Sequence, residues 1–386
     1  MRFQSKRYCV RLRAKSLIVN LSINLFYKPV FKVVVPMKKH NFLHKHQKTL
    51  APLLSLVLII LVTASITPGF LSLRIVDGHL FGSLLDILHR ATPTAIVALG
   101  MAVVIGTRGI DLSVGAVIAI SGAVTAVLTV NTDFPVWLVI LCALGTGIIC
   151  GLWNGILVSV FNIQPIVATL ILMVAGRGIA QMITEGQIVT FHSDVLDAIG
   201  NGYFLAFPIR VWIAIGMIAL TVLVMRKTAL GLFIEAVGAN VRASRLVGIE
   251  ARLLVLSAYV FSGFCAAMSG IILAADIRGA DANNAGLWLE LDAILAVVLA
   301  GASLAGGRIY LLLTIVGVLI IQTLTTAILT SGLPAQYNLV VKATIILAVL
   351  LIQSPKTRQW LSGIFLKNKN AGSAGKASTD KGSTRA

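Results

Sequence analysis

The sequence predicts an all-α, polytopic integral membrane protein with about ten transmembrane helices. Of its 386 residues, 58% are hydrophobic and only 12% are charged, whereas soluble domains contain about 25% charged residues. The mean hydropathy is +0.95. Apolar runs long enough to cross a bilayer as helices recur along the chain. These observations exclude an ordinary soluble domain.

The net charge of +18 is concentrated in two tails. Residues 1–50 contain twelve Lys and Arg and no acid, and residues 353–386 contain seven Lys and Arg with Asp380 as the only acid. The body between them is neutral overall, so nucleic acid is not an expected partner. Lys and Arg concentrate in the cytoplasmic segments of membrane proteins. We therefore expect both termini in the cytoplasm and membrane lipid around the body.

Three regions follow from this charge distribution. They are a basic cytoplasmic tail at 1–47, a transmembrane domain at 48–353 and a basic, disordered cytoplasmic tail at 354–386. Basic sequence with short apolar patches fills residues 1–36, so we expect this part to be disordered or untranslated.

Met37 precedes a short basic region and an apolar helix, and is the expected start of translation. The alternative is a signal peptide over residues 37–64 that is cleaved after Val62-Thr63-Ala64. An uncleaved first helix gives an even number of spans, which agrees with both tails lying on one side.

Taken in order, the apolar runs predict spans at 50–68, 91–108, 113–131, 135–158, 164–183, 210–226, 253–275, 290–305, 309–331 and 337–353. The connection before the second span includes an expected interfacial helix from Ser83. That connection and the acidic loop at 184–209 are predicted to be external. Arg108, Arg308 and the segment between the sixth and seventh spans are predicted to be internal, because they are cationic. A row of small residues in the fourth span predicts close helix–helix contact, at Gly145, Gly147, Gly151 and Gly155.

The internal segment at 227–252 contains two predicted short helices. The first covers Ala229–Val237 and the second covers Val241–Val247. A break and an N-cap lie between them, and a glycine follows the second helix at the C′ position. One interpretation is a docking site for another protein, and the other is an ordinary cationic loop. The candidate contact residues are Glu235, Gly238, Asn240, Arg242, Ala243, Arg245, Leu246, Val247 and Gly248.

Polar residues interrupt the apolar sequence near Asp111 and Ser113. Such a break must face protein or a water-filled path, and an ionisable residue there suggests ligand passage. The alternative is that Asp111 caps the following helix, with Gly109 forming the turn and Arg108 neutralising the carboxylate. Asn154 and Gln164 either line the same path or hydrogen-bond between helices.

A further polar segment covers residues 276–292. Planar polar side chains and an aromatic face are suited to binding a sugar, so this segment is a candidate external mouth. The alternative is a solvated hydrophilic loop. The candidates are Asp276, Arg278, Asp281, Asn283, Asn284 and Trp288. Glu290 and Asp292 begin the next apolar run, where acids favour a helix N-terminus.

The sequence predicts no catalytic constellation, cofactor or metal site. Ala374-Gly375-Lys376 resembles the end of a phosphate-binding loop, but Asn370 and Ala377 occupy positions that require glycine and Ser or Thr. The chain is therefore not expected to be an enzyme or to hydrolyse ATP by itself. Arg177 and Lys342 lie within apolar segments, where each is expected to reach an interface or to pair with an acid on another helix.

Four motifs resemble the membrane permeases of bacterial ATP-binding-cassette (ABC) importers for ribose, xylose, galactose and related sugars. They are GIDLSVGAVIAISG at 109–122, GLWNGILV at 151–158, QPIVATLILMVAGRGIA at 164–180 and ELDAILAVVLAGASLAGG at 290–307. The resemblance covers roughly residues 48–353. The sequences at 186–191 and 275–293 are most similar to galactofuranose permeases of that family. Residues 1–36 have no counterpart in the family. Ala300 stands where the family usually has glycine, and Ala302 where it usually has threonine or glycine.

This resemblance implies a multi-pass protein of the bacterial inner membrane that moves a sugar, galactofuranose, into the cytoplasm by alternating access. It also implies three kinds of partner: an ABC ATPase, a periplasmic sugar-binding protein, and a second permease copy or a homologous permease. The region matching Ala229–Ile249 would be the segment that couples to the ATPase. The alternative function is an ion-gradient-driven secondary transporter of a small polar solute, which would need intramembrane acids such as Asp111 and Asp292.

Overall fold

A computed structural model describes residues 42–67, 69–76, 79–332 and 337–353. The chain divides into two units, Met1–Gln47 and Lys48–Ala386. In the first unit, the described part is the beginning of helix α2 (Phe42–Ile66). All features discussed below belong to the second unit. The expectations for residues 1–36, for Met37 and for the C-terminal tail lie outside the described residues.

Within the described residues, seven helices are long and apolar enough to cross a membrane. They are α3 (Ser83–Gly106), α4 (Val114–Asn131), α5 (Val136–Ser159), α6 (Pro165–Ile183), α8 (Ile209–Lys227), α11 (Ala251–Ile277) and α13 (Leu311–Thr330). Helices α2 and α14 (Asn338–Gln353) contribute the shorter apolar segments Leu50–Ile66 and Leu339–Leu351. The prediction of an all-α membrane protein is confirmed.

Two predicted spans differ from the helices observed. Helix α3 begins at Ser83, because the expected interfacial helix is continuous with the span. The span predicted at 290–305 is wrong in length, since helix α12 (Leu289–Leu299) has only 11 residues. At 1.5 Å per residue this helix covers about 16 Å, roughly half of the hydrocarbon core. After it, Gly301 and two later glycines adopt positive φ angles, which end the helical path.

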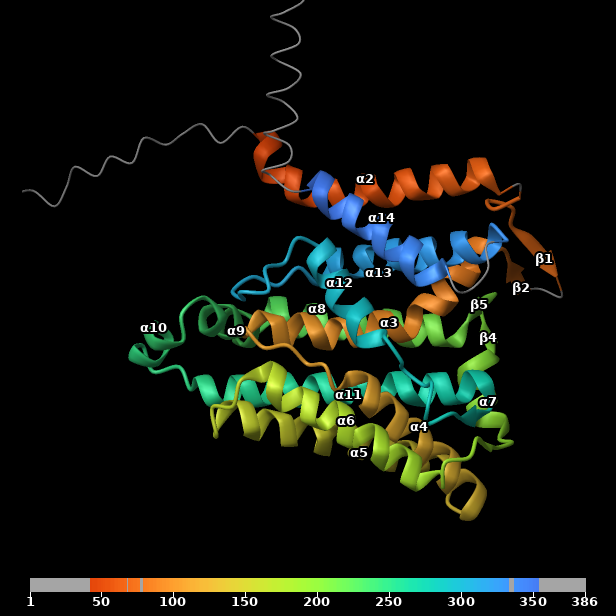
Figure 1. The fold of residues 1–386 in the computed structure, drawn as a ribbon, viewed down its shortest axis with the longest axis horizontal. Helices are drawn as coiled ribbons and strands as arrows, with labels where there is room; N and C mark the ends of the chain where they lie inside the picture. Colours follow the sequence, from red (N-terminus) through yellow and green to blue (C-terminus); the bar gives the residue numbers. More distant parts are fainter. Residues whose placement is uncertain (1–41, 68, 77–78, 333–336, 354–386) are drawn as a thin grey trace, which may run out of the picture. The chain divides into compact units, whose positions relative to one another are not determined.

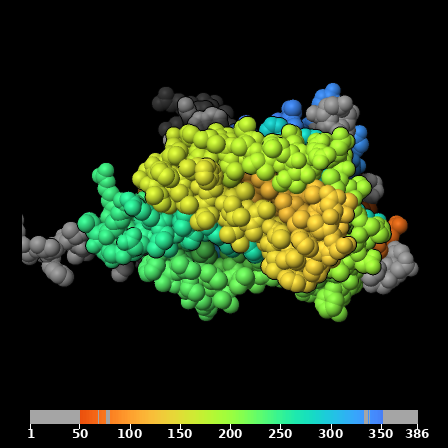
Figure 2. Space-filling model, turned by 90° about the horizontal axis from the view of Figure 1, so that it is seen from below, coloured from red at the N-terminus to blue at the C-terminus, as the bar shows by residue number. Residues whose placement is uncertain are grey.

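Helices α3 and α11 form the centre of the bundle. The stretch 91–106 of α3 is buried throughout, and α11 packs against α3, α4 and α5 (Figure 1). In contrast, α5, α6 and α8 expose many Leu, Ile and Val side chains on their outer faces. The yellow and yellow-green atoms of α5 and α6 lie across the face seen in Figure 2. An apolar outer surface of this kind is suited to contact with lipid.

Helix α5 lies against α11 along a row of glycines. Gly147, Gly151 and Gly155 leave no room for a side chain because the backbone of α11 is adjacent. A Cβ on Gly151, for example, would lie 2.8 Å from the Cα of Val260. Gly145 instead faces open space. The predicted helix–helix contact is confirmed for three of the four glycines.

Short strands and one short helix gather at one end of the second unit (Figure 1). The antiparallel strand pairs are β1 (Arg74–Val76) with β2 (His79–Phe81), β3 (Val189–Thr190) with β6 (Gly279–Ala280), and β4 (Tyr203–Phe204) with β5 (Phe207–Pro208). Helix α7 (Asp194–Asn201) lies among them, whereas α9 (Ala229–Ala239) and α10 (Val241–Leu246) lie at the opposite end. This arrangement groups the segments predicted to be external at one end and places the predicted internal segment at the other.

Candidate functional site

A buried polar cluster lies at the first break, which we define as residues 107–113 between α3 and α4. Asp111 Oδ1 accepts hydrogen bonds from the Ser113 backbone N–H at 3.1 Å and from Ser113 Oγ at 2.6 Å. Asn154 Nδ2 on α5 donates to Ser113 Oγ at 2.8 Å. Ser262 Oγ on α11 donates to Asp111 Oδ2 at 2.7 Å. Each of these residues is at most 1% exposed, so the cluster joins three helices in the interior.

Three of the predicted path residues, Asp111, Ser113 and Asn154, therefore lie together. Sequence reasoning missed Ser262, although a serine beside Gly263 in an apolar span was a detectable signal. Gln164 is not part of the cluster, because it precedes α6 and is exposed. Thr169 is the α6 residue that reaches the first break instead, with Oγ1 3.4 Å from the Ile110 carbonyl oxygen.

The backbone of the first break differs from the predicted cap. Asp111 accepts the backbone N–H of Ser113, but Ser113 is itself the N-cap residue of α4 and no side chain caps that helix, so Asp111 is not its cap. In addition, Arg108 rather than Gly109 adopts the left-handed conformation, with φ of 69°. The Arg108 guanidinium does not neutralise Asp111, because its Nη2 donates to the Ala239 carbonyl oxygen at 2.6 Å. Gly109 is needed for space, since a Cβ there would lie 2.6 Å from the Tyr259 hydroxyl oxygen.

The outer loop, residues 281–288, is organised by the Asp281 carboxylate. Its Oδ1 accepts the backbone N–H groups of Asn283 and Asn284, and its Oδ2 accepts Asn284 Nδ2 at 2.7 Å. The Asn284 side chain and these N–H groups hold the pKa of Asp281 below its usual value. From α6, Gln181 Nε2 donates to Asn283 Oδ1 at 2.6 Å. Trp288 ends the loop with φ of 67° and is 50% exposed.

The two cations that lie within apolar segments behave differently. Arg177 Nη1 donates to the carbonyl oxygens of Ala282 and Ala285, at 3.1 and 2.6 Å, so it holds the outer loop rather than pairing with an acid. Of the two alternatives predicted for Arg177, pairing with an acid on another helix is not observed. Lys342 does pair with an acid on another helix, since its Nζ lies 2.7 Å from Asp292 Oδ2.

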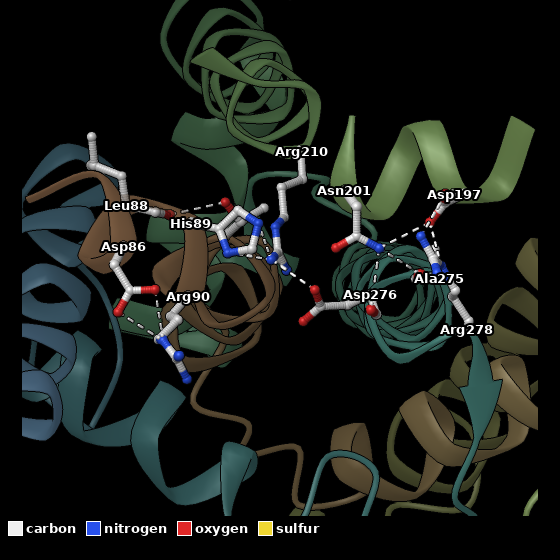
Figure 3. A network of polar contacts seen from close by, with 11 residues as sticks. Asp86, Leu88, His89, Arg90, Asp197, Asn201, Arg210, Ala275, Asp276 and Arg278 are labelled. Atoms are coloured by element: carbon white, nitrogen blue, oxygen red, sulfur yellow. Dashed lines mark hydrogen bonds and ion pairs between the residues drawn. The ribbon is translucent and has the colours of Figure 1, made fainter. Parts of the chain in front are cut away.

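Two ion pairs fix the ends of helices near the outer loop (Figure 3). Arg210, only 2% exposed, places Nη2 2.9 Å from Asp276 Oδ1 and also contacts the ring of His89. Arg278 donates from Nε and Nη2 to the two carboxylate oxygens of Asp197, at 2.8 and 2.9 Å. Asp276 and Arg278 thus connect α11 to α8 and α7.

The Arg278–Asp197 pair perturbs both groups. The hydrogen bonds from Arg278, followed by one from Asn201, hold the pKa of Asp197 below its usual value. The same pair raises the pKa of Arg278. Both side chains are well exposed, so the pair orients the end of α7 without a large desolvation cost.

Helices α9 and α10 form as predicted, with slightly different bounds. Asn240 Oδ1 accepts the Ala243 N–H at 3.1 Å and caps the start of α10. Gly248, with φ of 84°, follows its end. The Gly248 and Ile249 N–H groups bond to the carbonyl oxygens of Arg245 and Ser244, which is a Schellman motif.

The outer surface of α10 combines apolar and basic side chains. Leu246 is 89% exposed and Val247 is 75% exposed. Arg242, Ala243 and Arg245 are exposed beside them. In Figure 2 the sea-green atoms around α10 project at the left, beyond the helices that cover this face.

Glu235 and Gly238, in contrast, face the bundle. Glu235 Oε1 accepts the Ile309 N–H at 3.0 Å. Gly238 is buried, and a Cβ there would collide with the Gly106 carbonyl oxygen. No group of three or more metal-ligating side chains was found among the described residues.

Comparison with known proteins identifies the family. Residues 83–350 match the family model described as branched-chain amino acid transport system, permease component. The chain belongs to this family. It is therefore a permease component of a transport system, a multi-pass membrane protein rather than an enzyme.

Several curated permeases are similar along most of their length. The galactofuranose transporter permease protein of Escherichia coli (strain K12) is 57% identical over 317 residues, which cover 82% of this chain and 93% of that protein. The fructose import permease protein of Bifidobacterium longum is 38% identical over 79% of this chain and 87% of that protein. The ribose import permease protein of Haemophilus influenzae is 35% identical over 77% of this chain and 90% of that protein. No solved structure matches this permease.

Proposed function

We propose that this permease carries a sugar, galactofuranose, into the cytoplasm as the membrane-spanning subunit of an ABC importer. Support for the substrate comes from the 57% identity to the galactofuranose transporter permease, which extends along 93% of that protein. The ribose and fructose permeases are only 35% and 38% identical. The partners in this proposal are an ABC ATPase, a periplasmic sugar-binding protein, and a second permease that is either the same chain or a homologue.

The observation that carries the ATPase partnership is the exposed face of α10. Leu246 and Val247 are large apolar residues that project from a capped helix at the end of the bundle opposite the outer loop. Burial of one such side chain contributes about 1.5–3 kcal/mol. Arg242 and Arg245 beside them would orient an acidic partner surface. Helices α9 and α10, in the segment 227–252, would then transmit ATP-driven movement to the bundle.

The test of this partnership is the double substitution Leu246→Asp with Val247→Asp. We expect co-purification of the ATPase to weaken at least tenfold, since a tenfold change requires only about 1.4 kcal/mol. Charge reversal at Arg242 and Arg245 is expected to act in the same direction. Leu205→Asp is the matched control, because Leu205 is 71% exposed at the opposite end of the bundle. Sugar uptake by vesicles that contain no ATPase would refute the importer and favour an ion-driven transporter.

Two acids that an ion-driven transporter could use are already engaged. Asp111 accepts three hydrogen bonds from Ser113 and Ser262. Asp292 is paired with Lys342 at 2.7 Å. These contacts support structural roles for both acids, and they favour an ATP-driven importer over an ion-driven transporter.

We also propose the outer loop as the external mouth for the sugar. Asn283, Asn284 and Trp288 provide amide groups and an exposed indole within one short loop, and Arg177 holds the loop backbone at Ala282 and Ala285. Asp281 shapes the loop, whereas Asp276 and Arg278 support it through their ion pairs.

Substitution of Trp288 by Ala is expected to raise the KM for uptake of galactofuranose delivered by its binding protein. Leu287→Ala is the control, since Leu287 is 46% exposed in the same loop but offers no aromatic face. Equal KM values for the two variants would contradict a sugar contact at Trp288.

A further inference from the structure

The end of α9 is attached to two interrupted segments of the bundle. One is the first break, and the other is the second break, defined here as residues 300–310 between α12 and α13. Arg108 in the first break donates from Nη2 to the carbonyl oxygen of Ala239, the last residue of α9, at 2.6 Å. Glu235 on α9 accepts the backbone N–H of Ile309 in the second break at 3.0 Å. One helical turn of α9 therefore holds both breaks.

The same three segments also meet through their backbones. Gly307 N donates to the Gly106 carbonyl oxygen at 3.2 Å and so joins the second break to the end of α3. Gly238 lies directly on this junction, since a Cβ there would collide with Gly106 and lie 2.8 Å from Gly307 N. At Gly238 no side chain fits, so α9 lies there directly against the backbone of Gly106 and Gly307 and its displacement is passed on at this contact.

The first break continues from this junction to the buried cluster. Only two residues separate Arg108 from Asp111, and both are held by their neighbours. Gly109 N bonds to the Val104 carbonyl oxygen at 3.0 Å. The Ile110 carbonyl oxygen lies 3.4 Å from both the Tyr259 hydroxyl and Thr169 Oγ1. Asp111 then bonds to Ser262 on the central helix α11.

We propose that Arg108 and Glu235 are positioning residues that make α9 and both breaks move as one body. Movement imposed on α10 is then delivered to the Asp111 cluster and to the start of α13 together. This inference rests on the proposed coupling to an ATPase. The two side chains touch neither sugar nor ATP, and they act through the backbone groups of Ala239 and Ile309.

The first test separates transport from ATP hydrolysis in the reconstituted complex with the ATPase and the binding protein. We expect Glu235→Ala and Arg108→Ala to retain the ATPase subunit and ATP hydrolysis but to lower the sugar transported per ATP at least tenfold. Glu235→Gln is the matched control, because its amide oxygen still accepts the Ile309 N–H and should preserve the ratio. A wild-type ratio in both alanine variants would overturn the proposal.

The second test does not depend on how well the alanine variants fold. A Cβ built on Gly307 lies 3.7 Å from the Cβ of Ala239, close to the mean of about 3.8 Å for a disulfide. In a chain lacking its native cysteines, Ala239→Cys with Gly307→Cys would link α9 to the second break. Because these segments move together in the proposal, oxidised and reduced forms should transport equally. Transport blocked by oxidation and restored by reductant would show that α9 slides past the break, which would overturn the proposal.

The outcomes also separate this inference from the proposed function. A wild-type complex without ATP-dependent sugar uptake would contradict the importer itself. Normal wild-type uptake with unaffected alanine variants would contradict only the roles of Arg108 and Glu235.

Discussion

Arg210 is a charged side chain buried in a bundle that is otherwise mainly apolar, and its partners explain why it is stable there. Asp276 lies 2.9 Å away and is itself 30% exposed, so the pair links the interior to the outer surface (Figure 3). A buried charge without a partner carries a large desolvation cost. The pair therefore constrains α8 and α11 at the end that carries the outer loop.

Asp276→Ala should destabilise the permease by about 3 kcal/mol, the lower end of the range for breaking a buried pair, because Asp276 is partly exposed. The measurement is thermal unfolding in detergent. Asp276→Asn is the control, since it retains an oxygen that can accept from Arg210 and should lose less. Equal losses in the two variants would mean that the hydrogen bond contributes little.

The ion pair of Asp197, in the first turn of α7, makes the stability of the fold depend on pH. Its pKa is lowered by Arg278 and Asn201 from an ordinary 3.8. A carboxyl whose pKa is lower in the folded state stabilises the fold above its unfolded pKa, and this contribution is lost as pH falls through the folded pKa. The wild type should therefore exceed Asp197→Asn in melting temperature at pH 6, and the difference should shrink as pH falls below 3.8. A difference that stays constant with pH would contradict the linkage.

At the scale of helices, close approach decides the packing of α5 on α11. Glycine is used on both sides, since Gly263 on α11 faces Gly147 and Gly151 on α5. Without a hydrophobic driving force between helices in lipid, such backbone proximity is a main source of packing energy. Helix α11 then carries Ser262 to the Asp111 cluster, so this packing also positions the candidate site.

Gly151→Ala should cost about 1–3 kcal/mol, because the new methyl group would overlap the Tyr259 carbonyl oxygen. Gly145→Ala, on the same helix but facing open space, should be neutral or stabilising by up to about 1 kcal/mol. Unfolding of the two variants under identical conditions gives the comparison. Equal effects would show that the α5–α11 approach is not limited by backbone contact.

At the scale of the whole second unit, the two ends have different chemistry. One end carries the strand pairs, α7 and the outer loop, and the other carries α9 and α10 with their arginines. Basic segments remain on the cytoplasmic side during insertion. We expect α10 to face the cytoplasm and the turn between β4 and β5 to face the periplasm.

This orientation can be measured with single cysteines in a chain lacking its native ones. The two positions are Leu205→Cys and Leu246→Cys, because Leu205 is 71% exposed and Leu246 is 89% exposed. A membrane-impermeant maleimide added outside intact spheroplasts should label the first and spare the second, and inverted vesicles should give the reverse. The same labelling pattern for both positions would contradict the topology.

The sequence by itself determined the class of the protein and the order of its segments. Hydropathy and charge distribution require no contact information, because burial in lipid acts on each apolar run separately. Local rules also predicted the capped pair α9–α10, since Asn240 and Gly248 act on neighbouring backbone groups. The eleven-residue length of α12 was missed because residues 290–305 form one apolar run, and hydropathy does not reveal that Gly301 adopts a positive φ angle there and ends the helical path.

Only the tertiary structure decided which polar residues meet. Asp111, Ser113 and Asn154 were predicted as candidates, but their joint contact with Ser262 depends on the packing of three helices. Asp276 and Arg278 were predicted to form part of the external mouth. In the structure they pair with Arg210 on α8 and Asp197 on α7, so they support the outer loop. In the capping alternative Arg108 neutralised Asp111, but its side chain binds α9 instead. Such pairings join residues far apart in the chain, and their geometry is set by helix packing rather than by spacing in the sequence.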